Sequence, residues 1–179
     1  MAVDIGCEAI DRPSYFTHGY TRINKTKPAE VAGIITSIEI WALTDITGLK
    51  VGTVYTTNGN RLKCRASEAI AGTITAGSKV TKAVSIAVEI GDYIAYYCYA
   101  GYIEETGAGA GTWSSVTDRL DPDVEWDYKF HADSVFSLGG YITPPVVGWT
   151  GKISGVTNPA KIMGVDVANI AKVKGVVSA

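Results

Sequence analysis

The chain has 179 residues, of which 46% are hydrophobic, and its sixteen basic and eighteen acidic side chains give a formal net charge of −2 at pH 7. This apolar fraction is enough for a packed core, so the composition excludes a chain that is disordered throughout. The near-neutral charge argues against a strongly basic nucleic-acid-binding surface. The apolar runs are shorter than a membrane span. Neither a nucleic acid nor a membrane is therefore expected as a partner.

The chain begins without the basic and apolar regions of a secretory signal, which predicts that it is made without one. Its three cysteines, Cys7, Cys64 and Cys98, and its two histidines exclude most disulfide and zinc frameworks. Cys98 lies in the apolar run 93–99, which predicts a buried free thiol. A bridge between Cys64 and Cys98 on neighbouring strands is the alternative.

Apolar side chains recur with period two along most of the chain, and this period predicts strands. One predicted face holds Ile34, Thr36, Ile38, Ile40 and Ala42, opposite Ser37 and Glu39. Another face holds Val80, Val84, Ile86, Val88 and Ile90. The clearest alternation comes late, where Asp127, Lys129 and His131 alternate with Trp126, Tyr128 and Phe130.

Turn sequences separate these strands. Asn58-Gly59-Asn60 is typical of a hairpin, and further turns are expected at Asp45-Ile46-Thr47-Gly48 and at Gly91-Asp92. We count about eight or nine strands before residue 145, at the spacing of a sandwich. No helical pattern connects them, so the sheets should be antiparallel. The expected fold is all-β: an antiparallel two-sheet sandwich of jelly-roll type with a short C-terminal extension.

Thr143-Pro144-Pro145 ends the last strong strand, because proline cannot donate to a strand ladder. The predicted domains are therefore a sandwich over residues 1–145 and a C-terminal tail over residues 146–179. Three segments of the tail share one pattern, Lys, β-branched residue, any residue, Gly, Val, and begin at Lys152, Lys161 and Lys172. Brief helical turns are also expected in the tail, with caps at Asn158-Pro159 and Asp166 and stops at Gly164 and Gly175.

The tail is too short to build a core of its own, so its apolar side chains are expected to pack on another surface. The predicted assembly residues of the tail are Ile153, Val156, Ile162, Val165, Ile170 and Val173. That surface is either the sandwich of the same chain or a neighbouring subunit. The pattern leaves both readings open.

Several stretches resemble a known class of protein. The segments GIITSIEIWA (33–42), VGTVY (51–55) and VEIGDYI (88–94) resemble β-sandwich domains in bacteriophage and environmental viral structural proteins. The tail is similar to the Lys-Ile/Val-x-Gly-Val endings of phage virion proteins, including fibre and other surface proteins. The resemblance covers most of the chain in pattern, and the tail repeat is its more specific part. It implies a virion or other extracellular assembly role and carries over no catalytic residues.

An acidic loop is the candidate metal site. Asp118, Asp121 and Asp123 could supply oxygen ligands to calcium from one loop, although the spacing of an EF-hand is absent. A solvated acidic loop is the alternative. Calcium is the one cofactor that the sequence suggests.

Aromatic residues provide a second candidate site. Tyr99, Tyr102 and Trp113 could stack on sugar rings, with core packing or subunit contact as the alternative. Glu104 and Glu105 are adjacent and face opposite sides of a strand, so they cannot act together in glycoside hydrolysis. No catalytic residue is predicted, and we expect the protein not to be an enzyme.

These observations favour a non-enzymatic structural protein that self-assembles, as a virion surface, tail or fibre component. Its expected partners are copies of itself and other virion or assembly proteins, and its expected location is a virion or an extracellular assembly. The alternative is a carbohydrate-binding jelly-roll module, with or without calcium. A local basic stretch near the N-terminus, with Arg12, Arg22, Lys25 and Lys27, is interpreted as a solvated strand face or a subunit contact.

Overall fold

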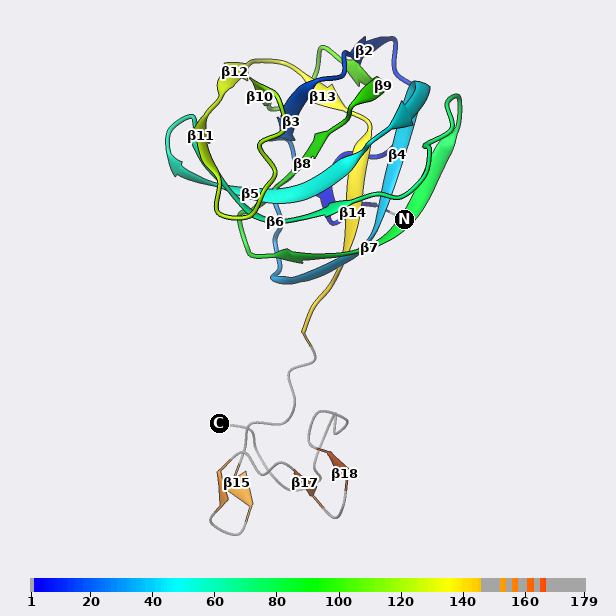
Figure 1. Ribbon diagram of the computed structural model, residues 1–179. Coiled ribbons are helices and arrows are strands. Elements are labelled where there is room, and N and C mark those ends of the chain that lie inside the picture. The colour runs from blue at the N-terminus through cyan, green and yellow to red at the C-terminus, as the bar shows by residue number, and fades with distance from the viewer. Residues whose placement is uncertain (1, 146–151, 154–155, 158–160, 163–164, 167–179) are drawn as a thin grey trace. The chain divides into compact units, whose positions relative to one another are not determined.

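A computed structural model describes residues 2–145 and, in the C-terminal part, residues 152–153, 156–157, 161–162 and 165–166 (Figure 1). Every regular element among these residues is a strand. The chain divides into two compact units, Met1–Pro144 and Pro145–Ala179. We call the first unit the block.

Two sheets make up the block, and all the strand pairs in them are antiparallel. The first sheet contains β1 (Ile5–Gly6), β14 (Leu138–Thr143), β4 (Gly33–Thr47), β9 (Ala100–Thr106) and β13 (Val135–Phe136) in that order, with β7 (Lys79–Val88) on β4 and β2 (Ser14–Phe16) on β9. The second sheet has the order β11 (Glu125–Asp127), β6 (Arg61–Ala69), β5 (Lys50–Asn58), β8 (Tyr93–Tyr97), β3 (Tyr20–Asn24), β10 (Thr112–Val116) and β12 (Lys129–His131).

The two sheets pack face to face around a first core. Ile35, Ile38 and Ile40 of β4 and Ile86 of β7 meet Tyr96 of β8 in this core. Burial of these side chains from water is the main favourable term for such a structure. The expected antiparallel two-sheet sandwich is confirmed, while the jelly-roll connectivity stays a prediction.

The second sheet also curls around a second core. β11 pairs with β6 at one edge of the sheet and β12 pairs with β10 at the other, and only Tyr128 separates β11 from β12 in the chain. One segment therefore joins both edges, which protects them from pairing with other chains. The residues of the second core are Ile23, Val54, Leu62, Cys64, Ala95, Trp113, Leu120 and Tyr128.

Because the second sheet has a core on each face, its central strands are apolar on both sides. Val51 of β5 lies in the first core and Val54 in the second, while on β8 Ile94 lies in the first and Ala95 in the second. A strand covered on both faces loses the alternation of apolar and polar residues. This explains the continuous apolar run of residues 93–97.

A bulge changes the predicted alternation of β4. The pairing register of β4 shifts between Ile35 and Ser37 against β7, and β14 shows a shift at the same level. Ile35 is completely buried, whereas Ile34 is 38% exposed. The prediction that Ile34 and Thr36 share the buried face is therefore wrong, because one extra residue reverses the order of the faces.

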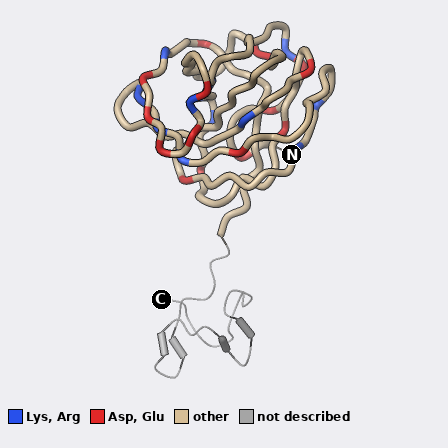
Figure 2. The backbone as a smooth tube through the Cα atoms, in the orientation of Figure 1, with Lys and Arg blue, Asp and Glu red and all other residues tan. Residues whose placement is uncertain are grey.

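Acidic and basic residues are interspersed along the backbone of the block (Figure 2). No helix in the described part of the chain is long and apolar enough to cross a membrane.

Candidate functional site

Two of the three C-terminal repeats form strand pairs of the same kind. In the first, β15 (Lys152–Ile153) pairs with β16 (Val156–Thr157), and in the second, β17 (Lys161–Ile162) pairs with β18 (Val165–Asp166). Ile153 is opposite Val156 in the first pair, and Ile162 is opposite Val165 in the second. Four of the six predicted assembly residues therefore hold equivalent places. Ile170 and Val173 lie outside the described residues.

The strand pairs correct the expectation of brief helical turns in this region. Lys161–Ile162 lies between the predicted cap at Asn158-Pro159 and the predicted stop at Gly164, and it is a strand. In each repeat two residues, of which the second is glycine, separate the paired strands in the sequence.

Strand pairs of this size are marginal on their own. Each of the two pairs joins strands of only two residues. An isolated hairpin, even a longer one, is at best marginally stable in water and needs further strands or a packed face. The repeat is thus the candidate association segment, which we define as residues 152–157 and 161–166.

The predicted aromatic residues separate into different environments. Tyr99 lies between β8 and β9 and is 74% exposed. Tyr102 of β9 stacks on Tyr15 with ring centroids 4.8 Å apart and on His18 at 5.9 Å. Trp113, in contrast, is 3% exposed and lies in the second core, where its Nε1 donates to Asn60 Oδ1 at 2.9 Å. Its buried rings offer no face to a sugar, so Trp113 does not belong with Tyr99 and Tyr102.

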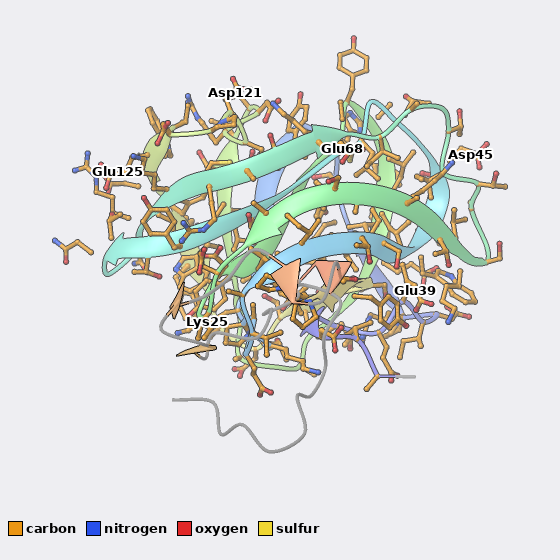
Figure 3. The ribbon with its side chains drawn as sticks, turned by 90° about the horizontal axis from the view of Figure 1, so that it is seen from below. Lys25, Glu39, Asp45, Glu68, Asp121 and Glu125 are labelled. Carbon is orange, nitrogen blue, oxygen red and sulfur yellow. The ribbon has the colours of Figure 1, made fainter. Side chains whose placement is uncertain are left out.

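The acidic loop is neutralised by lysines of the second sheet. Lys50 Nζ lies 3.0 Å from Asp118 Oδ2 and 2.5 Å from Asp121 Oδ1, and Lys63 Nζ lies 2.9 Å from Asp123 Oδ1. Figure 3 shows Asp121 on the periphery of the block. Within residues 2–145, no group of three or more His, Cys, Asp or Glu side chains has the arrangement that a metal ion needs. The carboxylates that could have bound calcium are therefore paired with lysines instead.

A row of polar side chains crosses the second sheet. Arg22 of β3 is the direct partner of Tyr96 on β8 and of Ser114 on β10, so the three side chains share one face. The guanidinium of Arg22 lies 3.8 Å from the centroid of the Phe16 ring. Burial lowers the pKa of Arg22 and raises that of Tyr96 well above its ordinary value. Arg22 Nε and Tyr96 Oη are buried without a hydrogen-bond partner among the described atoms.

Ser114 and His131 form a hydrogen bond between their side chains, with Ser114 Oγ 2.8 Å from His131 Nε2. Burial, reinforced by the charges of Arg22 and Lys129, lowers the pKa of His131. Ser114 is only 7% exposed. We interpret the pair as a cross-strand contact that fixes β12 on β10.

Sequence reasoning placed His131 on a strand but did not bring Ser114 to it. The alternating residues of 126–131 predicted one continuous strand, whereas Tyr128 divides it into β11 and β12 on different neighbours. The partner of His131 depends on that division. A tyrosine flanked by polar residues continues the alternation, so the sequence does not indicate that the strand divides at Tyr128.

No protein-family model matches the chain, and the search of curated proteins finds no match.

Proposed function

We propose that the protein is a non-enzymatic structural subunit that self-assembles through its C-terminal repeat. The observation that carries this proposal is the equivalent pairing of the two repeats, Ile153 with Val156 and Ile162 with Val165. A sequence that repeats the same minimal strand pair, and that gains little stability from each pair, benefits from a surface supplied by another molecule.

The block supports this proposal as a rigid support for the repeat. It contains two cores, and its second sheet has both edges joined by the segment that includes Tyr128. β7 is an edge strand of the first sheet. The Oε2 atom of Glu68 on β6, a residue labelled in Figure 3, accepts a hydrogen bond from the backbone N–H of Ser85 on β7 at 2.7 Å. Thr53 Oγ1 donates to the carbonyl of Ala87 at 2.7 Å. Edges capped in this way disfavour sheet-to-sheet aggregation and leave association to the repeat.

The resemblance of the repeat to the endings of phage virion proteins supports a finer proposal. In it, the protein is a virion surface, tail or fibre component, with copies of itself and other virion proteins as partners. The location in this proposal is a virion or an extracellular assembly.

The test of self-assembly is light scattering of the full chain after size-exclusion chromatography. We expect an oligomer that dissociates when Ile153→Ser and Ile162→Ser are introduced together. The matched control is Leu43→Ser with Val116→Ser, which replaces two exposed apolar residues of the block (44% and 56% exposed) and should leave the oligomer intact. A wild-type chain that stays monomeric at every concentration contradicts the proposal.

One observation favours a second candidate function, the binding of a glycan. The exposed rings of Tyr15 and His18 stack on the half-buried Tyr102, and such rings pack against the apolar faces of sugars. Saturation-transfer NMR with neutral oligosaccharides tests this candidate. Transfer that disappears in Tyr15→Ala supports it, and the absence of transfer to any of the sugars removes it.

A further inference from the structure

β4 begins and β7 ends at the same end of the block (Figure 1). Exposed apolar side chains lie at this end. Its apolar residues are Val31 (42% exposed), Ile34 (38%) and Ile90 (70%). Glu30 and Glu89, each next to one of them in the chain, are also exposed. We call these five residues the end patch.

Backbone pairing brings the two segments of the end patch together. Gly33 is opposite Val88 and Ile34 is opposite Ala87 in the ladder of β4 and β7. Beyond the ladder, the N–H of Gly91 donates to the carbonyl of Ala29 at 2.8 Å. Residues 29–34 and 87–91 therefore run side by side, and Val31 and Ile90 fall between these two anchor points. Exposed apolar side chains gathered in this way mark interaction surfaces more often than scattered ones do.

The charges of the end patch complement the C-terminal repeat. Glu30 and Glu89 take part in none of the ion pairs within the described part of the chain. Each described repeat begins with a lysine, followed by an isoleucine and, three residues later, a valine. A segment that carries one positive charge beside two β-branched side chains fits a surface of glutamates beside β-branched side chains, and opposite charges also fix the register of such contacts.

The block ends beside the same surface. Thr143, the last residue of β14, is the direct partner of Ile34. The C-terminal part of every copy therefore starts at the end of the block that carries its own end patch. A twofold contact between copies is reciprocal, so an end patch that binds the repeat of a second copy would have its own repeat bound by the end patch of that copy.

We propose that the end patch of one copy binds a Lys-Ile-x-Gly-Val hairpin, residues 152–157 or 161–166, of a second copy. This inference rests on the proposed function, because it names the surface on which the repeat assembles. The apolar side chains provide the affinity, and the pairs between glutamates and lysines select the partner.

Charge reversal in the full-length chain tests the pairing. Glu30→Lys with Glu89→Lys should raise the concentration at which half of the chains are assembled by about tenfold, because like charges then face each other. This factor corresponds to about 1.4 kcal/mol. Lys152→Glu with Lys161→Glu should have a similar effect. A chain with all four changes should recover most of its assembly, because the opposite charges again face each other.

Ile34→Ser with Ile90→Ser tests the apolar contact, and Leu43→Ser with Val116→Ser is its matched control. Circular dichroism shows whether each variant keeps its strands. Assembly that persists in the end-patch variants but fails in Ile153→Ser with Ile162→Ser overturns the end patch and leaves the proposed function in place. A wild-type monomer overturns both.

Cross-linking distinguishes a contact between copies from one within a copy. Chains that carry Ile90→Cys are mixed with isotope-labelled chains that carry Ile153→Cys, both with Cys7→Ser, because Cys7 is the one partly exposed thiol of the three. A disulfide between labelled and unlabelled chains supports the proposal. If the mixture gives no such link, while a single chain with both cysteines closes on itself, docking on a second copy is wrong.

Discussion

Arg65 and Asp92 form a bidentate ion pair that ties the two sheets together. Arg65 Nε lies 2.5 Å from Asp92 Oδ2 and Nη2 lies 3.0 Å from Oδ1, and Asp92 is only 1% exposed. Asp92 Oδ2 also accepts from the N–H of Glu89 at 2.9 Å, in the turn between β7 of the first sheet and β8 of the second. The pair therefore fixes the connection that folds one sheet over the other.

We expect Asp92→Ala to lower the free energy of unfolding by ~3 kcal/mol, the lower end for a broken buried pair, because part of the Arg65 side chain remains in water. Urea unfolding followed by circular dichroism measures this loss. The control is Glu125→Gln, which breaks the more exposed pair with Arg61 and should cost no more than ~1 kcal/mol. Equal losses in the two variants would show that Asp92 does not have this role.

The two cores predict unequal roles for two tryptophans. Trp113→Ala should cost ~4 kcal/mol, because it removes the largest side chain of the second core and leaves Asn60 without its partner. Trp126 is 42% exposed and its ring contacts the guanidinium of Arg119, so Trp126→Ala should cost ~1 kcal/mol. Chemical denaturation of both variants checks the ranking. A larger loss for Trp126→Ala would contradict the division into two cores.

The thiols should react in the order of their exposure. Burial raises the pKa of Cys98 to about 11 and that of Cys64 to about 12, and both side chains are 1% exposed. Only the thiolate reacts with alkylating reagents, so both should be protected at pH 8 in the folded protein. Cys7 is partly exposed and should be modified first. Mass spectrometry after treatment with iodoacetamide identifies the site, and early modification of Cys64 would contradict the burial of this strand.

The sequence predicted the class of the fold well, because alternation and turn residues are local properties. It predicted the faces of β7 correctly for Val84, Ile86 and Val88, which are buried, whereas Ile90, expected on the same face, lies beyond the end of β7 and is 70% exposed. It failed where a face depends on distant partners. The bulge at Thr36 and the division at Tyr128 arise from the strands that pair on either side. For the same reason, the buried Trp113 looked like a residue that could bind sugars.

The bulge in β4 can be tested by mutation, because the bulged register buries Ile35 and the simple alternation of the sequence exposes it. Ile35→Ala should cost ~3 kcal/mol, because Ile35 is buried in the first core, although the simple alternation would place it outside. The control in the same strand is Leu43→Ala, which is 44% exposed and should change stability by about 0.5 kcal/mol. Unfolding in urea compares the two. If Ile35→Ala leaves the free energy of unfolding unchanged, Ile35 is not buried and the assignment of the bulge is wrong.

The lowered pKa of His131 predicts a stability that depends on pH. Burial is the main cause, and Arg22 and Lys129 add to it, so the folded state binds a proton at lower pH than the ordinary pKa of 6.5. Between the two pKa values the unfolded state holds more protons, and stability therefore falls as the pH is lowered through this window. Above 6.5 the effect is absent. His131→Gln should remove this part of the pH dependence, and Lys129→Gln should reduce it.

The measurement is the free energy of unfolding between pH 5 and pH 8 at constant ionic strength, compared as wild type minus variant. Burial raises the pKa of Glu104, which gives a pH dependence of the opposite sign, but this contribution is common to all three proteins and cancels in the difference. The difference for His131→Gln should become less favourable to the wild type below pH 6.5 and stay constant above it. Parallel curves would mean that His131 titrates alike in the folded and unfolded chains, and the contact with Ser114 would then not shield it from water.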